Sequence, residues 1–312
     1  MKILLTGAAG QLGQALRQHV PAGIELIATS RSGDGGADPG GGGLVPLDLA
    51  DADACRAAVL THRPDWVLNG GAYTAVDRAE SEPELALAVN GGAPRAFAEA
   101  LLETGGRLLQ VSTDFVFNGQ QGSPYRPEQG RDPLGAYGRT KAAGEEAVEQ
   151  LLGVAAGGEG SGQCVILRTS WVIGPVGKNF ALTMLRLHRE RGASGQALGV
   201  VEDQVGCPTS TATLAAACWR VITANVQEPV LHWCDAGAAS WFDVAVAVGE
   251  LAQELGLLLQ PAPVNPLTTA EYPLPAQRPS YSLLDCSSSR RALQLAPTPW
   301  RQALRQLLEA MP

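Results

Sequence analysis

Short apolar segments alternate with longer segments of helical periodicity through the first half of the 312-residue chain. The apolar runs predict strands at residues 3–6, 25–30, 45–47, 66–69, 107–112 and 165–170. Apolar residues spaced three and four apart predict helices between most of them, among others at residues 51–62, 83–103 and 137–152. A chain that alternates strands and helices folds into a mostly parallel sheet covered by helices on both faces. We therefore predict an α/β fold with a Rossmann-type doubly wound parallel sheet.

The order of elements changes after about residue 172. Further helical patterns and short strands are predicted at residues 179–191, 199–201, 211–223, 230–233, 241–255 and 301–310, and a proline-rich surface loop at 261–279. We expect a first domain of residues 1–172 and a smaller C-terminal α/β domain, mainly residues 173–312, with about 205–240 returning to the first. The cleft between them would lie at the carboxyl ends of the strands, where such sheets bind ligands.

Composition excludes several classes of protein. Hydrophobic residues make up 45% of the chain and charged residues 17%, which is enough apolar material for a buried core and excludes general disorder. The net charge is -8 without a Lys/Arg-rich run, so we expect no nucleic-acid partner. No stretch approaches the ~18 consecutive apolar residues of a membrane helix, and two glycine-rich segments, 33–43 and 153–162, predict surface loops.

The six cysteines are scattered, with no Cys-x-x-Cys pair, which fits a reducing compartment and predicts no metal site. The expectation is a cytoplasmic protein with a small-molecule substrate, no membrane association, and a monomeric or homodimeric state.

A glycine-rich turn follows the first predicted strand. Gly7, Gly10 and Gly13 have the spacing G-x-x-G-x-x-G, and Gln11 and Leu12 lie between the last two. Glycines at a strand-to-helix junction allow a tight turn and let the backbone approach a pyrophosphate, which the positive end of the helix stabilises. A plain turn is the alternative, but the position at the first junction favours a dinucleotide site.

Residues after the second and third strands bear on the choice of cofactor. Ser30 and Arg31 stand where an NAD-binding chain usually has an acidic residue, and a guanidinium pairs well with a 2′-phosphate. NADPH is therefore preferred, with NADH possible, because Arg31 could also be a solvated surface residue. Asp48 and Leu49 follow the third strand, where a carboxylate could meet adenine. Residues 1–172 would then be the NADP-binding domain and 173–312 mainly the substrate-binding domain.

The candidate for proton transfer is Tyr137 with Lys141. Positions i and i+4 share one face of a helix, and a nearby ammonium is expected to lower the pKa of a phenol towards the working pH. Such a phenol suits the general acid of a carbonyl reduction. A bare Y-x-x-x-K also occurs by chance, but here Ser112 and Thr113 put hydroxyls at the carboxyl end of the preceding strand, where one could hold a substrate oxygen. Trp171, after the sixth strand, could stack on a sugar or fill the core.

Longer motifs resemble those of the dTDP-4-dehydrorhamnose reductases, members of the extended short-chain dehydrogenase family. The matching segments are residues 72–80 (AYTAVDRAE), 111–117 (VSTDFVF), 168–172 (RTSWV), 179–181, 202–209 (EDQVGCPT) and 278–279. The resemblance implies NADPH-dependent reduction of the C4 ketone of dTDP-4-dehydro-L-rhamnose to dTDP-L-rhamnose. It also implies roles for individual residues.

By motif match, the catalytic residues would be Thr113, Tyr137 and Lys141. The substrate would be bordered by Val76, Thr113, Asp114, Phe115, Tyr137 and Trp171. The cofactor would be bound by Gly7, Gly10, Gln11, Leu12, Gly13, Ser30, Arg31, Asp48, Leu49, Ala72, Tyr73, Thr74, Tyr137 and Lys141.

The chain departs from the family pattern at a few positions. Phe115 stands where the family usually has Tyr, and Gly70 and Gly71 where it usually has two alanines. Some members dimerise through a metal held near the C-terminus, but the acidic side chains for that bridge are missing from residues 301–306. Two alternatives remain open: another nucleotide-sugar reductase, epimerase or dehydratase, and a non-catalytic NADP-binding regulatory subunit. A dehydratase typically has an acidic residue at the position of Phe115, and a binding-only subunit has no need of Tyr137 and Lys141.

Overall fold

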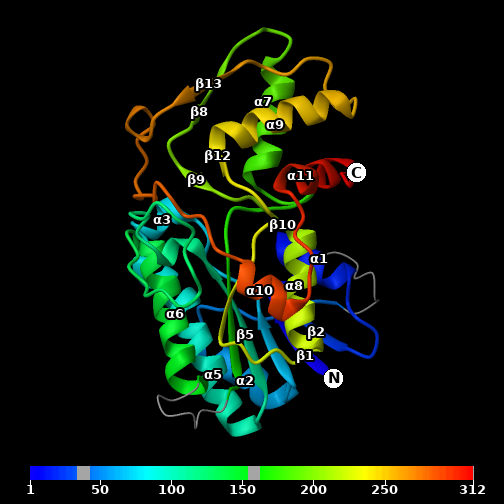
Figure 1. Ribbon diagram of the computed structural model, residues 1–312. Coiled ribbons are helices and arrows are strands. Elements are labelled where there is room, and N and C mark those ends of the chain that lie inside the picture. Colours follow the sequence, from blue (N-terminus) through cyan, green and yellow to red (C-terminus); the bar gives the residue numbers. More distant parts are fainter. Residues whose placement is uncertain (34–42, 154–161, 312) are drawn as a thin grey trace.

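The computed structural model describes residues 1–33, 43–153 and 162–311 (Figure 1). Its central element is a seven-stranded sheet in the order β11-β6-β5-β4-β1-β2-β3, and every pair of neighbours is parallel. The strands are β1 (Lys2–Thr6), β2 (Glu25–Ser30), β3 (Val45–Pro46), β4 (Trp66–Asn69), β5 (Arg107–Thr113), β6 (Cys164–Thr169) and β11 (Val230–His232). The strand order reverses between β1 and β4, which makes this the topological switch point of a doubly wound sheet.

Helices cover both faces of the sheet (Figure 1). On one face α1 (Gln11–Gln18) packs on α8 (Thr211–Thr223); on the other α2 (Ala52–His62), α5 (Ala93–Thr104) and α6 (Ala136–Leu152) pack in a row. Neighbouring strand residues divide between the two layers: Ile3 and Leu5 join the core under α1 and α8, and Leu4 joins the core under α2 and α5. The alternation of side chains along each strand therefore supplies two cores from apolar runs.

A smaller group of elements lies above the carboxyl ends of the sheet strands (Figure 1). It contains α7 (Phe180–Arg191), α9 (Trp241–Glu254) and α11 (Trp300–Glu309), which share a third apolar core with the parallel pair β8 (Leu198–Val201) and β13 (Val264–Leu267). Two short pairs connect the two parts: β7 (Val172–Ile173) with β10 (Thr209–Ser210), and β9 (Val205–Gly206) with β12 (Ala239–Ser240).

Two expectations about elements were wrong, and one helix was missed. The segment 83–103 is not one helix, because the five-residue π-helix η1 (Ala88–Gly92) separates α4 (Pro83–Leu87) from α5. The segment 261–279 is not only loop, since it contains β13 and the 3-10 helix η3 (Thr269–Glu271). Helix α10 (Ser287–Leu293), which packs on α8 and β11, was not predicted.

The two glycine-rich segments predicted as loops, 33–43 and 153–162, lie almost wholly outside the described residues. Among the residues that are described, no helix combines the length and the apolar character that crossing a membrane requires.

Candidate active site

The glycine turn between β1 and α1 has a backbone that only glycine permits. Gly7 has φ +68°, and a Cβ atom there would lie 2.6 Å from the Cα of Gly71. A Cβ on Gly13 would lie 2.2 Å from the carbonyl oxygen of Gly7. Gly10 is exposed, and no side chain caps the first turn of α1 behind it. Because no side chain of the described residues caps the start of α1, its first N–H groups and the positive end of the helix fit the pyrophosphate of a dinucleotide.

Two side chains of this turn are engaged by the rest of the protein. Leu12 is 9% exposed and belongs to the apolar core, so only its backbone is available to a ligand. The amide of Gln11 accepts a hydrogen bond from Asn179 Nδ2 (2.7 Å), at the start of α7. Gln11 thereby connects the glycine turn to the smaller part of the molecule.

The ends of β2 and β3 lie beside the glycine turn. The hydroxyl of Ser30 is buried and has no hydrogen-bond partner among the described residues, whereas Arg31 is exposed. Asp48 is exposed, and its Oδ1 accepts the N–H of Ala50 (3.0 Å). Leu49 lies against Gly71, where a Cβ would come within 2.5 Å of its Cδ1. An unpaired buried hydroxyl followed in the chain by an exposed arginine fits a phosphorylated ribose.

The side chain of Asn90 holds the backbone of segment 72–74 through hydrogen bonds. Asn90 lies in η1 and was not singled out from the sequence. Its Oδ1 accepts the N–H of Tyr73 (2.9 Å), and its Nδ2 donates to the carbonyl of Tyr73 and to Thr140 Oγ1 (both 3.1 Å). The Tyr73 hydroxyl donates to Glu82 Oε2 (2.5 Å). Asn90 thus joins the loop after β4 to α6, and the widened π turn is what places it between them.

The structure brings Thr113, Tyr137 and Lys141 together at the carboxyl end of β5. Thr113 ends that strand, and its hydroxyl contacts Asp114 Oδ1 (3.0 Å). Tyr137 lies in the first turn of α6, where its ring meets that of Phe115 edge-on at 5.5 Å. Lys141 is 4% exposed and donates to the carbonyl of Val111 (2.7 Å).

A glycine in α6 permits this close approach. A Cβ on Gly138 would lie 2.3 Å from the carbonyl oxygen of Phe115, in the 3-10 helix η2 (Asp114–Val116). Helix α6 can therefore pack directly on the end of β5, which places Tyr137 beside Thr113.

The pKa values in this cluster follow burial. Desolvation raises the pKa of Tyr137 to about 12, against the effect of a hydrogen bond with Thr113. Burial lowers the pKa of Lys141 to about 8, although the charge of Glu145 acts in the opposite direction. The expected lowering of the Tyr137 pKa by Lys141 is therefore wrong for this state: the ammonium binds the carbonyl of Val111, and burial disfavours the phenolate.

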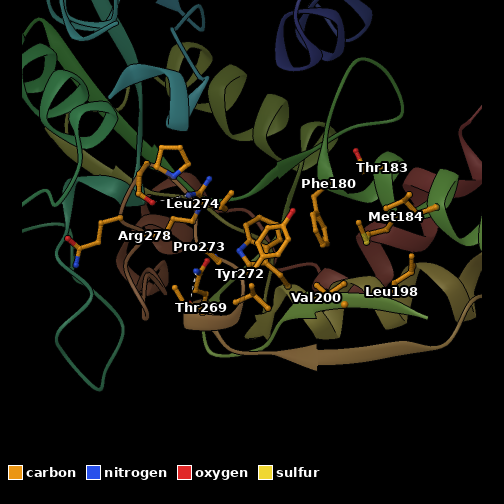
Figure 2. A pocket seen from close by; sticks show the side chains of 18 of the residues that line it. Phe180, Thr183, Met184, Leu198, Val200, Thr269, Tyr272, Pro273, Leu274 and Arg278 are labelled. Atoms are coloured by element: carbon orange, nitrogen blue, oxygen red, sulfur yellow. Dashed lines mark hydrogen bonds between the residues drawn. The ribbon is translucent and has the colours of Figure 1, made fainter. Parts of the chain in front are cut away.

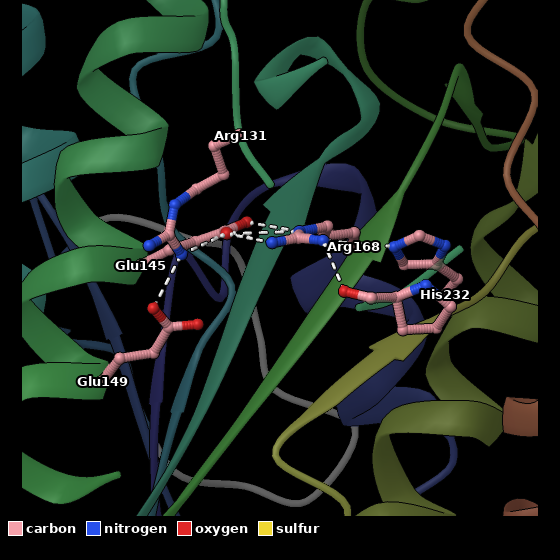
Figure 3. A network of polar contacts seen from close by, with 6 residues as sticks. Arg131, Glu145, Glu149, Arg168 and His232 are labelled. Atoms are coloured by element: carbon pink, nitrogen blue, oxygen red, sulfur yellow. Dashed lines mark hydrogen bonds and ion pairs between the residues drawn. The ribbon is translucent and has the colours of Figure 1, made fainter. Parts of the chain in front are cut away.

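A buried ion pair lies one helical turn beyond Lys141 (Figure 3). Glu145 of α6 is fully buried, and its carboxylate accepts from Arg168 of β6 through Nε (3.0 Å) and Nη2 (2.7 Å). Burial opposes the ionisation of Glu145, but the hydrogen bonds and charge of Arg168 outweigh it and lower the pKa. Arg131 adds a further ion pair to Glu145 (3.2 Å). The helix that carries Tyr137 and Lys141 is thereby fixed to the sheet by a two-point contact.

The same network contains His232, whose pKa falls to about 3 through burial and the charge of Arg168. Its neutral ring lies with Nδ1 3.0 Å from the carbonyl of Tyr125 and Nε2 3.4 Å from Arg168 Nη1. This assigns the hydrogen to Nδ1 and a structural role to the histidine.

Trp171 has a left-handed backbone (φ 46°), and its indole stacks on that of Trp241 at 3.6 Å. The ring also lies close to Gly206, where a Cβ would come within 2.7 Å of it. The indole is therefore held by protein on at least one face.

A cavity of about 900 Å³ lies between α7, the β8–β13 pair and the segment after η3 (Figure 2). Its wall is largely apolar and aromatic, with Phe180, Met184, Leu198, Val200, Trp241, Tyr272 and Leu274 among the lining residues. Gln277 and Arg278 form the end nearest α6, because the carbonyl of Gln277 lies 3.6 Å from the Cβ position of Gly135, just before that helix. Of all the residues that line the cavity, Phe180, Gln204 and Arg278 belonged to motifs recognised in the sequence.

No group of three or more His, Cys, Asp or Glu side chains suited to a metal ion occurs within residues 1–33, 43–153 and 162–311. All six cysteines are buried and free of disulfides.

Comparison with known proteins identifies the same family from the sequence and from the structure. The family model described as "RmlD substrate binding domain" matches residues 1–312. A dTDP-4-dehydrorhamnose reductase of Salmonella typhimurium is 35% identical, over 100% of this chain and 98% of that protein. The crystal structure of a dTDP-4-dehydrorhamnose reductase from Clostridium acetobutylicum superposes with a TM-score of 0.84 at 33% identity, covering 99% of both chains. The enzyme of the same name from Bacillus anthracis, solved in complex with NADP, gives a TM-score of 0.82 at 29% identity, covering 99% of this chain and 98% of that one. The chain therefore belongs to the dTDP-4-dehydrorhamnose reductase family of NAD(P)H-dependent oxidoreductases.

Proposed function

We propose that this protein reduces the C4 ketone of dTDP-4-dehydro-L-rhamnose with NADPH and forms dTDP-L-rhamnose. The observation that carries the proposal is the cluster of Thr113, Tyr137 and Lys141, which lies at the carboxyl edge of a sheet whose switch point carries a glycine turn. Membership of the reductase family supports the choice of substrate.

The residues around the switch point fit a dinucleotide. The uncapped start of α1 would hold the pyrophosphate, with Gly7, Gly10 and Gly13 providing the space. The unpaired hydroxyl of Ser30 and the exposed Arg31 would meet the ribose phosphate of NADPH. Asp48, Leu49 and residues 72–74 would border the adenine and the nicotinamide side. When bound, the cofactor supplies the hydride for the ketone.

The protein itself would contribute a proton donor placed near the ketone and a hydroxyl that polarises the ketone oxygen. A Tyr137 pKa of about 12 keeps the phenol protonated at neutral pH, so it is ready to donate to the oxygen that becomes an alkoxide. Thr113 would hold the same oxygen through its hydroxyl. Lys141 would keep a positive charge beside the phenol as the proton leaves, and would hold the cofactor ribose.

The sugar nucleotide would extend from this cluster into the apolar cavity. Val76, Asp114, Phe115 and Trp171 would border the sugar, and the aromatic wall would hold the nucleotide. We accordingly assign dinucleotide binding to residues 1–172, with a return at about 205–240, and sugar-nucleotide binding mainly to 173–312. The pairing of β11 with β6 and the packing of α8 on α1 support that return.

We further propose a cytoplasmic location, which the six free cysteines support, and a monomeric or homodimeric state.

The test follows NADPH absorbance with dTDP-4-dehydro-L-rhamnose generated in the same reaction, beside an NADH control. The proposal predicts oxidation of NADPH with formation of dTDP-L-rhamnose, and a slower reaction with NADH. Tight NADPH binding without turnover of any keto-sugar would favour the regulatory subunit. Conversion of sugar without net oxidation of NADPH would favour an epimerase or a dehydratase.

A further inference from the structure

One wall of the cavity is a segment attached at both of its ends by carboxylates. We call residues 269–278 the strap. At its start, Asp203 accepts the N–H of Thr269 (2.9 Å) and the hydroxyl of Thr269 (2.6 Å). At its end, Arg278 donates to Asp77 through Nη1 (3.0 Å) and Nη2 (2.8 Å). Between these points the strap contributes Tyr272 and the five residues that follow it to the cavity wall (Figure 2).

The contact at Arg278 joins two parts of the molecule far apart in sequence. Asp77 lies in α3 (Val76–Ala79), the short turn that follows the loop after β4. Besides the two bonds from Arg278, Asp77 Oδ1 accepts the N–H of Ala276 (3.2 Å), and Arg278 Nη1 donates to the carbonyl of Ala276 (3.0 Å). The hydrogen bonds from Arg278 lower the pKa of Asp77, which is therefore ionised across the neutral range. A bidentate ion pair with two additional backbone hydrogen bonds fixes both the orientation of the strap and its distance from α3.

The same short turn also holds the helix that carries Tyr137. Glu80, one residue after α3, accepts the N–H of Ala136 (2.7 Å), the first residue of α6. A Cβ on Gly135 would lie 2.7 Å from Glu80 Oε1, so the glycine leaves room for this contact. Residues 76–80 therefore hold the strap with the carboxylate of Asp77 and the start of α6 with the carboxylate of Glu80.

We propose that the Asp77–Arg278 ion pair is a positioning contact that sets the strap against the start of α6 and thereby determines how tightly the nucleotide sugar is held. Asp77 and Arg278 are positioning residues, because they act on the strap and lie outside the Thr113–Tyr137–Lys141 cluster. The inference rests on the proposed function, because it assumes that the cavity receives the nucleotide part of the substrate.

The proposal predicts a split between KM and kcat. Asp77→Asn keeps the shape of the side chain but removes its charge and one of its two strong acceptors. The side chains of Asp77 and Arg278 are 35% and 18% exposed, so the pair is partly screened by solvent. We expect the KM for the keto-sugar to rise about three- to tenfold, as a loss of roughly 1 kcal/mol implies. The kcat should stay within about twofold, and the Kd for NADPH should not change.

The matched control is Glu84→Gln, which removes the same charge from an exposed position in α4 and should leave both constants unchanged. Arg278→Lys keeps the charge but loses the two-point geometry. Its KM should therefore be higher than that of the wild type and lower than that of Asp77→Asn. Titration calorimetry with dTDP gives a measurement without turnover, and its Kd should rise in parallel with the KM.

Several outcomes would overturn the inference. One is an unchanged KM and dTDP affinity in folded Asp77→Asn; another is a fall in kcat with the KM unchanged. A wild-type protein that neither binds dTDP nor reduces the keto-sugar would instead contradict the proposed function. The two failures are therefore distinguishable.

Discussion

The phenol of Tyr137 is protonated at neutral pH and can therefore act as a proton donor. Its pKa is raised to about 12 by burial, and its neighbours are the hydroxyl of Thr113 and the ring of Phe115. The spacing of Tyr137 and Lys141 could be predicted from the sequence because it follows from helix geometry alone. The direction of the pKa could not, because burial depends on how α6 packs against η2, and that packing depends on Gly138.

Replacing Tyr137 by Phe removes only the hydroxyl. Because general acid catalysis contributes about 10²- to 10⁴-fold, we expect kcat to fall by at least about a hundredfold. The Kd for NADPH should stay within about twofold of the wild type, as measured by fluorescence titration. Tyr125→Phe is the control: its hydroxyl contacts Asn118 (3.0 Å), away from the cluster, so the rate should be kept. A wild-type rate for Tyr137→Phe would mean that another group donates the proton.

Helices and strands with a simple periodicity could be predicted from the sequence. The π turn within residues 83–103 and the proline-containing strand β13 could not. The pattern of residues 83–103 continues through Gly91, Gly92 and Pro94, so nothing in the periodicity marks the π turn. Pro266 lies inside β13, and proline argues against a strand except at a sheet edge. Strand β13 has β8 as its only neighbour in the sheet topology of the described chain, so the proline is tolerated there.

Helix α6 is fixed to the sheet by the Glu145–Arg168 pair, and this gives a prediction about stability. Glu145→Gln would leave the buried guanidinium of Arg168 without its main counter-charge, and breaking such a pair costs about 3–5 kcal/mol. We expect the free energy of unfolding, measured with urea, to fall by roughly 3 kcal/mol, because the amide can still accept one hydrogen bond.

The matched control for this prediction is Glu149→Gln, one turn further along α6. Glu149 pairs with Arg131 at 2.8 Å, but its side chain is 34% exposed, so its loss should cost less than about 1 kcal/mol. Equal losses of stability in the two variants would show that burial of the Glu145–Arg168 pair is not what fixes the helix.

At the scale of the whole molecule, the doubly wound parallel sheet follows from the alternation of strands and helices and was predicted, whereas the strand order, with its switch point between β1 and β4, comes from the structure. The cavity was not predicted. Its wall is assembled from segments near residues 180, 200, 241 and 272, which approach one another only after the smaller part has folded. Local patterns carry no information about such an assembly, whereas the glycine turn and the Tyr/Lys helix are each contained in a few consecutive residues.

If the protein is the proposed reductase, hydride passes from NADPH to C4 of the sugar. This transfer can be followed directly with NADPH deuterated at C4 of the nicotinamide, on the transferred face, by mass spectrometry and NMR of the nucleotide sugar. We expect one deuterium per molecule of dTDP-L-rhamnose, located at C4 of the sugar, and one NADP formed for each product. Product without deuterium at C4, or conversion without stoichiometric NADP, would contradict it.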